Sequence, residues 1–437
     1  MNNMLPVEEN IYVAGNSGIV NLVNTCYMNS AVQVISHLYP LQEYLLQNEE
    51  SVKILILKNA PKFFSKQQFN EIITKLHRKD YTPRMLSLDE ATIILNSTMT
   101  YQLIKLLKGL WSDNQNPRTL LKRNASIAPV NFKHVFSEAR ENSFAGQLQH
   151  DAEEGYGCII QKMNEELSTS IKLKIRTCKA SVDELQTYRE NIERKIKLAE
   201  TESAKQDLLR KLNEKKKSMP NEKLILKSHR AMKKYYDVTS SIVTKQLSGF
   251  FQRTTSCPDA TCGHVSNKFE AYLHIPFAIP DCTDTTIYDC MNEYCKEETL
   301  DDNNKWNCKK CKKNVCGVTK MHLWTVPEIL VIQLKRFNFE LMKKNSKIVH
   351  FPITGLNIES MVSQVNIESM HNKSFTYDLH CVINHEGGVN CGHYYALCKN
   401  KSDGLWYRYN DTNVTKSSGK IVTSAAYMLF YSRRNTD

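Results

Sequence analysis

The sequence predicts an α+β fold, with helices in its first half and strands in its second. The apolar residues Ala31, Val34, Ile35 and Leu38 recur at i, i+3, i+4 and i+7, as they do on one face of a helix. From residue 249 onward the apolar runs become short and rich in β-branched and aromatic residues, and Gly-Gly and Asp-Gly turns separate several of them. Helices and strands that are segregated in this way are typical of the α+β class.

The first half reads as a succession of helices. The first is predicted to begin near Cys26, with Thr25 as its N-cap, and to end at Pro40. Residues 41–144 read as mixed helices joined by polar loops. A further helix is predicted over residues 151–167, because its apolar residues fall on one side.

The segment from residue 182 to residue 217 is rich in Glu, Lys, Gln, Leu and Ala. It contains no Gly or Pro, and the next proline is Pro220. This composition predicts one long, solvated, amphipathic helix that pairs with residues 224–243 as a coiled-coil hairpin. Residues 171–235 contain 19 Lys and Arg against 9 Asp and Glu, so most of the net charge of +12 lies here. A charge run is typical of a solvated helix face, but it also fits docking of an acidic partner, nucleic acid or a membrane surface.

The composition indicates a soluble globular protein, since 41% of the 437 residues are hydrophobic and 24% are charged. No run approaches the roughly 18 apolar residues of a membrane-spanning helix, and residues 1–16 read as a tail without a signal peptide. We therefore expect a cytoplasmic or nuclear location, or both. In such reducing compartments the 14 cysteines point to metal binding, catalysis or packing rather than to disulfides.

Cys26 stands where a polar turn leads into a predicted helix, within the sequence GIVNLVNTCYMNS of residues 18–30. A helix N-terminus favours a thiolate over a thiol, which suits a nucleophile. The amides of Asn21 and Asn24 could donate hydrogen bonds to a developing oxyanion. The alternative is that Cys26 is a buried packing residue.

A cysteine nucleophile needs a base and a third group that orients the base. The sequence HEGGVNCGHYY of residues 385–395 offers His393, and Asn410 follows in the sequence LWYRYND. Neighbouring strand residues face opposite sides, so Asn410 and Asp411 are not expected to reach His393 equally. We favour Asn410 as the orienting group and Asp411 as an assisting group; the alternative is that both are turn residues.

Four cysteines have the spacing of a structural zinc site. They are Cys257 and Cys262, separated by four residues, and Cys308 and Cys311, separated by two. Gly263 permits a tight turn after the first pair, and His264 and Cys316 are spare candidate ligands. The alternative is four reduced cysteines without a metal.

Taken together, these stretches resemble the sequence boxes of the ubiquitin-specific protease family. Residues 18–30 resemble its cysteine box, 147–154 its glutamine box, 326–337 a central strand, 385–395 its histidine box and 405–411 its closing strand. The sequence departs from the family pattern at Ile19 and Val23, which replace Leu and Gly, and at Gly155 and Tyr156, which replace Phe and Leu. A positive φ at position 23 would strain a valine.

The resemblance implies a papain-like fold with thumb, palm and zinc-ribbon fingers, in which residues 17–437 form the catalytic domain. The thumb would span about 17–170 and the fingers and palm about 245–437, with residues 171–240 as a basic helical insertion. The implied reaction is hydrolysis of the bond after the C-terminal glycine of ubiquitin, through a thioester. Ubiquitin or ubiquitinated proteins would then be the partners, and Zn²⁺ a structural cofactor.

The resemblance also assigns roles to individual residues. The implied catalytic residues are Cys26 as the nucleophile, His393 as the base, Asn410 as the orienter, Asn21 in the oxyanion hole and Asp411 as the assisting group. The implied substrate-binding residues are Gln149, Asp151 and Tyr394. Asp151 would face the basic C-terminal tail of ubiquitin, although a carboxylate at this position could also be a simple helix cap.

Three other functions are compatible with parts of this pattern. One is a ubiquitin-binding scaffold that has lost activity, which the departures at Val23 and Gly155 would favour. The second is a protease for a different ubiquitin-like modifier. The third and weakest is nucleic-acid binding through the basic segment.

Overall fold

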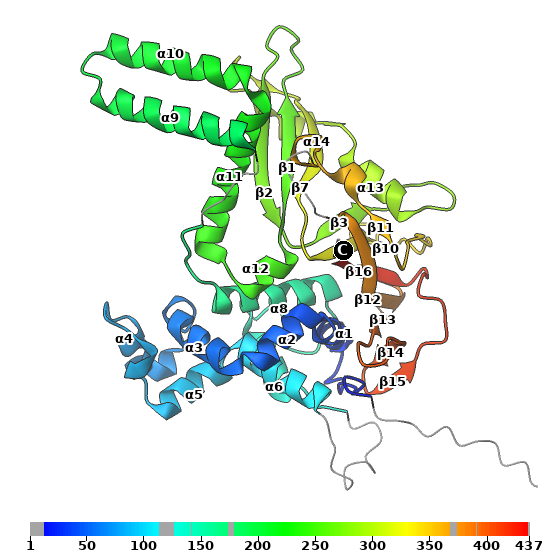
Figure 1. The fold of residues 1–437 in the computed structure, drawn as a ribbon. Helices are drawn as coiled ribbons and strands as arrows, with labels where there is room; N and C mark the ends of the chain where they lie inside the picture. Colours follow the sequence, from blue (N-terminus) through cyan, green and yellow to red (C-terminus); the bar gives the residue numbers. More distant parts are fainter. Residues whose placement is uncertain are drawn as a thin grey trace, which may run out of the picture. The chain divides into compact units, whose positions relative to one another are not determined.

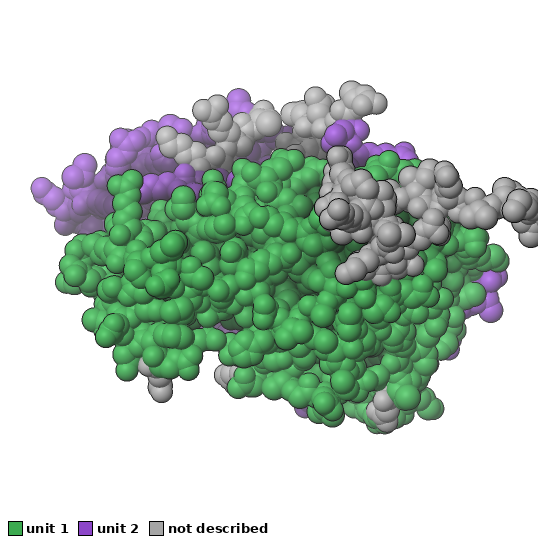
Figure 2. Space-filling model, turned by 90° about the horizontal axis from the view of Figure 1, so that it is seen from below, with its two compact units in different colours: residues 1–168, 332–350, 379–431 green, residues 169–331, 351–378, 432–437 purple. Residues whose placement is uncertain are grey.

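The computed structural model describes residues 13–112, 126–140, 142–173, 179–367, 374–389 and 391–435. Most of the predicted N-terminal tail, and Asn390 of the histidine box, lie outside these residues. The chain divides into two compact units, which Figure 2 colours separately. Unit 1 comprises residues 1–168, 332–350 and 379–431, and unit 2 comprises residues 169–331, 351–378 and 432–437.

Helices form the N-terminal part of unit 1 (Figure 1). They are α1 (Cys26–Ser36), α2 (Tyr39–Gln47), α3 (Glu49–Asn59), α4 (Asn70–Leu76), α5 (Leu88–Asn96), α6 (Met99–Trp111), α7 (Val130–Glu138) and α8 (Ala152–Leu167). All eleven residues of α1 are buried, because this helix packs against α8 on one side and against strand β13 on another. The nucleophile candidate therefore begins a helix in the core of unit 1.

The C-terminal part of unit 1 is an antiparallel sheet that α1 packs against. Its strand order is β15-β14-β13-β12-β16-β8. The bounds are β8 (Ile329–Lys335), β12 (Thr376–Gly387), β13 (Gly392–Lys399), β14 (Trp406–Asn410), β15 (Asn413–Lys416) and β16 (Ala426–Arg433), and a small hairpin is formed by β9 (Phe337–Asn338) and β10 (Lys343–Lys344). The turn between β12 and β13 places Glu386 opposite His393, so the candidate base lies at the start of a central strand.

Unit 2 combines the basic helices with a second antiparallel sheet of order β2-β1-β7-β4. Its helices are α9 (Ala180–Leu198), α10 (Glu202–Ser218), α11 (Pro220–Thr239), α12 (Ile242–Leu247), α13 (Ile287–Cys295) and α14 (Gln364–Ile367). Its strands are β1 (Gly249–Ser256), β2 (Val265–Tyr272), β3 (Ile275–Ala278), β4 (Glu298–Thr299), β5 (Trp306–Asn307), β6 (Asn314–Val315), β7 (Val318–Thr325) and β11 (Leu356–Asn357). No helix of the described segments has the length and apolar character needed to cross a bilayer.

The structure confirms the α+β prediction but corrects two helix boundaries. Helix α1 ends at Ser36, and Pro40 lies in the first turn of α2, where proline is well tolerated because its missing N–H has no helical partner to lose. The single long helix predicted for residues 182–217 is two helices. Thr201 caps α10 by accepting a hydrogen bond from the Ala204 N–H, so α9 pairs with α10, and α11 packs on α9 separately (Figure 1).

Candidate active site

Cys26 is the first residue of α1 and is 2% exposed. Thr25 is the N-cap residue as predicted, but its side chain does not cap the helix. Instead its hydroxyl accepts a hydrogen bond from the Leu22 N–H at 2.8 Å and lies 3.2 Å from Asn21 Oδ1, which also accepts from the Thr25 N–H. Thr25 therefore holds the turn that leads into the nucleophile.

This turn contains two consecutive left-handed residues. Val23 has φ +64° and Asn24 has φ +52°, so the strain foreseen for a valine at this position is present. Asparagine tolerates the left-handed region, whereas a β-branched residue there is a conformational outlier. The Asn24 amide donates to the Gln147 carbonyl at 2.8 Å, so it ties the turn to the segment before α8 and does not point toward an oxyanion.

The protonation of Cys26 differs from the expectation based on the helix N-terminus. Burial raises the pKa of the Cys26 thiol above its ordinary value. Backbone hydrogen bonds from Tyr394, Tyr27 and Cys26 itself act in the opposite direction, and the negative charge of Asp411 raises the pKa further. Desolvation therefore outweighs these backbone hydrogen bonds and favours the thiol over the thiolate.

His393 is oriented by Asn410. Its Nε2 lies 2.5 Å from Asn410 Oδ1, and an amide oxygen can only accept, so Nε2 carries the hydrogen and Nδ1 is left free to take a proton. Among the described residues no hydrogen bond joins the Cys26 sulfur to this imidazole. The Tyr394 N–H, one residue along β13, contacts that sulfur, so Cys26 lies beside the strand that carries His393.

Asp411 comes closer to the imidazole than strand alternation allows. Strand β14 ends at Asn410, and Asp411 turns into the left-handed region at φ +49°. Its Oδ2 consequently lies 3.9 Å from His393 Nε2. As expected, the two residues do not reach His393 equally: Asn410 Oδ1 lies 2.5 Å from Nε2, and Asp411 Oδ2 lies 3.9 Å from it. Both side chains nevertheless point toward this same nitrogen.

Two amides hold the Asp411 carboxylate. Asn21 Nδ2 donates to Oδ2 at 2.9 Å, and Asn29 Nδ2 donates to Oδ1 at 2.7 Å. The Asn21 amide has two hydrogens, so one remains for an oxyanion. Asn29, on α1 and 2% exposed, is a site residue that the sequence reasoning missed. Its position three residues after Cys26, on the same helix, was the available signal.

Two of the predicted substrate-binding residues hold the site together. Gln149 Nε2 donates to the Gly392 carbonyl at 2.8 Å, and its Oε1 lies 3.4 Å from the Gly392 N–H. Gly392 itself must be glycine, because a Cβ there would overlap the imidazole of His385. The Tyr394 ring is buried, and its hydroxyl receives a backbone hydrogen bond from Ala152. Gln149 and Tyr394 thus fix the turn and strand on either side of His393.

Asp151 is both a helix cap and a half-buried carboxylate. Its Oδ1 accepts from the Glu153 N–H at 2.7 Å, which caps α8, and the Tyr427 hydroxyl lies 2.7 Å from both carboxylate oxygens. Tyr427, which in turn accepts from Gln333, had no sequence signal. Burial raises the pKa of the Asp151 carboxyl to about 6. Within the described residues no cation pairs with it.

Comparisons with known proteins agree with this arrangement. A family model described as ubiquitin carboxyl-terminal hydrolase matches residues 17–431. A probable ubiquitin carboxyl-terminal hydrolase of Acanthamoeba polyphaga mimivirus is 38% identical over 435 residues, which cover 96% of this chain and 90% of the viral protein. The chain belongs to the ubiquitin carboxyl-terminal hydrolase family. This membership identifies the chain as a cysteine-type deubiquitinase, as the resemblance implied.

More distant members match over nearly the whole chain. Ubiquitin carboxyl-terminal hydrolase 2 of Rattus norvegicus is 25% identical over 95% of this chain and 54% of its own length. Among solved structures, a SAGA DUB module of Ubp8, Sgf11, Sus1 and Sgf73 bound to monoubiquitin matches with TM-score 0.59 and 20% identity, covering 99% of this chain and 73% of that chain. The same module bound to ubiquitin aldehyde gives TM-score 0.58 and 21% identity, with coverages of 97% and 70%. These likenesses confirm the ubiquitin carboxyl-terminal hydrolase fold.

The departures from the family pattern on α8 are accommodated by packing. A Cβ at Gly155 would lie 3.0 Å from the ring of Tyr27, so the space of a larger residue is taken by this tyrosine. Tyr156 is 1% exposed and packs edge-on against Phe430, with ring centroids 5.2 Å apart. The hydrolase core is therefore filled without the family's usual pair.

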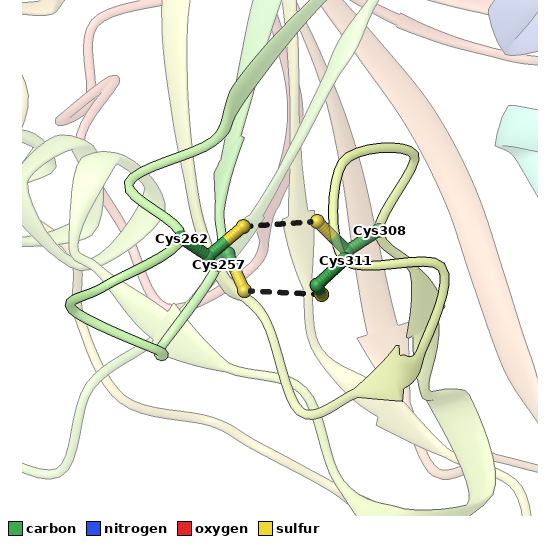
Figure 3. A group of neighbouring side chains, drawn as sticks. All are labelled: Cys257, Cys262, Cys308 and Cys311. Carbon is green, nitrogen blue, oxygen red and sulfur yellow. Dashed lines mark hydrogen bonds between the residues drawn. The ribbon is translucent and has the colours of Figure 1, made fainter.

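The four predicted metal-binding cysteines converge in unit 2 (Figure 3). The ligand atoms of Cys257, Cys262, Cys308 and Cys311 all lie within 4.8 Å of one another. Cys262 and Cys308 sulfurs are 3.6 Å apart, and those of Cys257 and Cys311 are 4.0 Å apart. Gly263 has φ +53°, as its turn requires. Cys316 is outside the group, with its sulfur 3.7 Å from Asp302, and His264 stacks on Trp306.

Proposed function

We propose that this chain hydrolyses the isopeptide or peptide bond after the C-terminal glycine of ubiquitin. The observation that carries the proposal is one constellation in unit 1: a buried cysteine at a helix N-terminus beside a histidine whose tautomer an asparagine sets. Cys26 is the nucleophile, His393 the general base and Asn410 its orienter. A family relationship of 38% identity over nearly the full length supports the same reaction.

The first half of the reaction transfers the acyl group to the enzyme. Because Cys26 rests as a thiol, its proton passes to His393 Nδ1 as the sulfur attacks the scissile carbonyl carbon. The resulting oxyanion accepts hydrogen bonds from the second Nδ2 hydrogen of Asn21 and from the Cys26 N–H. When the C–N bond breaks, the imidazolium gives its proton to the leaving amine, and a thioester remains on Cys26.

Water completes the cycle. It attacks the thioester carbonyl while His393 Nδ1 takes its proton, and the sulfur leaves and recovers that proton. Asp411 contributes by its charge and position. Its carboxylate fixes the Asn21 amide and lies 3.9 Å from the imidazole Nε2, where it stabilises the imidazolium formed in both halves.

Asp151 is the proposed recognition group for the basic tail of ubiquitin. A half-buried carboxylate whose only donors among the described residues are the Tyr427 hydroxyl and one backbone N–H is poorly compensated. An arginine of the substrate would supply the missing charge in a short, charge-assisted hydrogen bond. Gln149 and Tyr394 support this subsite by holding the adjacent Gly392 turn and β13.

We further propose that the four cysteines hold a structural Zn²⁺. Tetrahedral ligation with Zn–S distances of about 2.3 Å places sulfurs roughly 3.8 Å apart, close to the 3.6 and 4.0 Å observed. Four thiolates leave no open position, so the ion would stabilise the turns that carry Cys257–Cys262 and Cys308–Cys311. It would take no part in hydrolysis.

A ubiquitin probe with a C-terminal electrophile tests the activity. We expect the wild type to form a covalent adduct and Cys26→Ala to form none. Cys391→Ala is the matched control, because this exposed thiol lies two residues from His393 and should leave labelling unchanged. Binding of ubiquitin without an adduct would indicate an inactive scaffold. Labelling only by a probe built on another modifier would reassign the substrate.

A further inference from the structure

Helix α11 (Pro220–Thr239) has one buried face and one exposed face. Its buried face meets α9, β2 and α14, and its inward residues pack on the cluster that contains Phe250 and Trp324. Ile225, Leu226 and Ser228 on this face are 3%, 6% and 0% exposed. The residues of the opposite face are exposed, so its composition is free of core constraints.

Four basic residues line that exposed face. They are Lys223, Lys227, Arg230 and Lys234, at relative positions i, i+4, i+7 and i+11. At 100° per residue they fall within an arc of about 60°, and at 1.5 Å per residue they span roughly 16 Å. All four are exposed, and among the described residues none forms an ion pair. We call this set the α11 stripe.

The stripe does not stabilise its own helix. On α9 and α10, several basic residues are paired with acidic ones one turn away, as in Arg189–Glu193 at 3.0 Å and Lys211–Asp207 at 2.8 Å. Such pairs support a solvated helix, whereas like charges at i, i+4 oppose it. The α11 stripe places only positive charges three or four residues apart. A need to solvate an exposed helix face therefore does not explain this arrangement.

Neighbouring residues extend the stripe and add an apolar contact. Burial lowers the pKa of Lys227, and the positive charges of Lys309 and Lys223 lower it further, so Lys309 of the cysteine-bearing turn adds to the positive charge around the stripe. At the other end, Val238 follows one turn after Lys234 on the same face and is 64% exposed. The surface therefore combines a line of positive charge with a terminal hydrophobic side chain.

We propose that the α11 stripe is a docking surface for an acidic helical segment of a partner protein. An α-helix with carboxylates at i, i+4, i+7 and i+11 has the same periodicity, so each carboxylate can meet one basic side chain along the full length. Val238 favours a protein partner over a nucleic acid, because an apolar side chain has a counterpart on a helix but none on a phosphate backbone. The inference is independent of the proposed hydrolysis.

The test uses two fluorescent helical peptides of identical composition. One has glutamates aligned at the four stripe spacings, and its isomer has them distributed around the helix. Since each exposed ion pair changes binding by roughly 1.5- to 5-fold, we expect the full-length wild type to bind the aligned peptide about tenfold or more tightly than the isomer at low salt. The preference should shrink as salt rises.

Two fourfold variants separate the stripe from the general charge of the insertion. The stripe variant is K223E/K227E/R230E/K234E, and the matched control is R194E/K195E/K197E/K217E, which reverses the same residue types at exposed positions of α9 and α10. We expect the stripe variant to lose the tenfold preference and the control to retain it. Circular dichroism establishes that both variants are folded.

Three outcomes would overturn the proposal. Equal binding of the two peptides would show that alignment is irrelevant. Equal losses in the two variants would assign the binding to diffuse charge. Tighter binding of a 20-base-pair DNA duplex than of the aligned peptide, weakened by the stripe variant, would make the stripe a nucleic-acid surface instead.

Discussion

The turn before the nucleophile stores backbone strain that substitution of Val23 can measure. Val23 has φ +64° and is 52% exposed, so its backbone is in the left-handed region while its side chain is not buried in the core. Any residue with a Cβ is disfavoured there by roughly 1–2 kcal/mol, and glycine is not. Against this gain, glycine loses roughly 0.5–1 kcal/mol more backbone entropy than alanine on folding.

The comparison of alanine with glycine isolates this effect, because both substitutions remove the valine methyls. We expect Val23→Gly to have an unfolding free energy higher than that of Val23→Ala by about 0.5–1 kcal/mol. Val130 is the matched control, since it is 58% exposed, lies in the same unit and begins the right-handed helix α7. There Gly should be less stable than Ala by up to about 1 kcal/mol.

Urea denaturation followed by tryptophan fluorescence and circular dichroism gives both differences from the midpoint and slope. The opposite signs at positions 23 and 130 are the diagnostic result. If the glycine variant were less stable than the alanine variant at both positions, the turn would not be strained. Residue 23 would then not keep a left-handed backbone conformation in solution. Equal slopes for the four variants are required for the comparison.

Three further predictions concern the site and the metal. Asn29→Ala should lower kcat about tenfold and leave KM unchanged, because loss of a charge-assisted hydrogen bond releases the Asp411 carboxylate; steady-state kinetics on a ubiquitin substrate measures this. KM should rise as the pH falls through about 6, because protonated Asp151 no longer attracts a basic tail; Asp151→Asn should show a high, pH-independent KM. Elemental analysis should find one zinc per chain in the wild type and none in Cys308→Ser, and this variant should melt at a lower temperature than the wild type. Cys316→Ser should keep the metal.

Each of these predictions has an outcome that contradicts it. Asn29→Asp places a second carboxylate beside Asp411 and should be worse than Asn29→Ala; equal losses would mean that Asn29 acts only in packing. A pH profile of KM that persists in Asp151→Asn would assign the titration to another group. Since burial raises the Asp151 pKa from 3.8 to about 6, ionisation opposes folding: the stability from this group is lost as the pH rises from about 3.8 through about 6, and it does not change further above that. Asp151→Asn should therefore be more stable than the wild type at pH 7.5.

Local patterns sufficed for much of the fold because they depend on near neighbours. The apolar repeat placed the start of α1 at Cys26, and short β-branched runs placed the first strand at Gly249. The α9–α10 break was not predicted because no Gly or Pro interrupts residues 182–217, whereas a threonine cap at Thr201 is enough to start a new helix. Pro40 was misjudged for the related reason that proline can begin a helix as well as end one.

Residues that act through distant contacts could not be inferred in the same way. Tyr427 contacts Asp151 across 276 positions of sequence, and Asn29 contacts Asp411 across 382. Neither partner has a local pattern, since an isolated tyrosine in a strand or asparagine in a helix is compatible with many roles. Their function appears only when the sheet of unit 1 brings the end of β14 and the start of β16 to the first turns of α1 and α8.

Cys26 shows how a correct local argument can give the wrong sign. A helix N-terminus does lower a thiol pKa, and the backbone N–H groups around Cys26 act in that direction. Burial, however, arises from β13 and α8, which pack on α1 from distant parts of the chain, and its effect is larger. A nucleophile that rests as a thiol resists adventitious oxidation and alkylation, because the thiolate is the reactive form. In the proposed reaction, activation depends on proton transfer to His393, so reactivity toward small alkylating agents should be low in the absence of substrate.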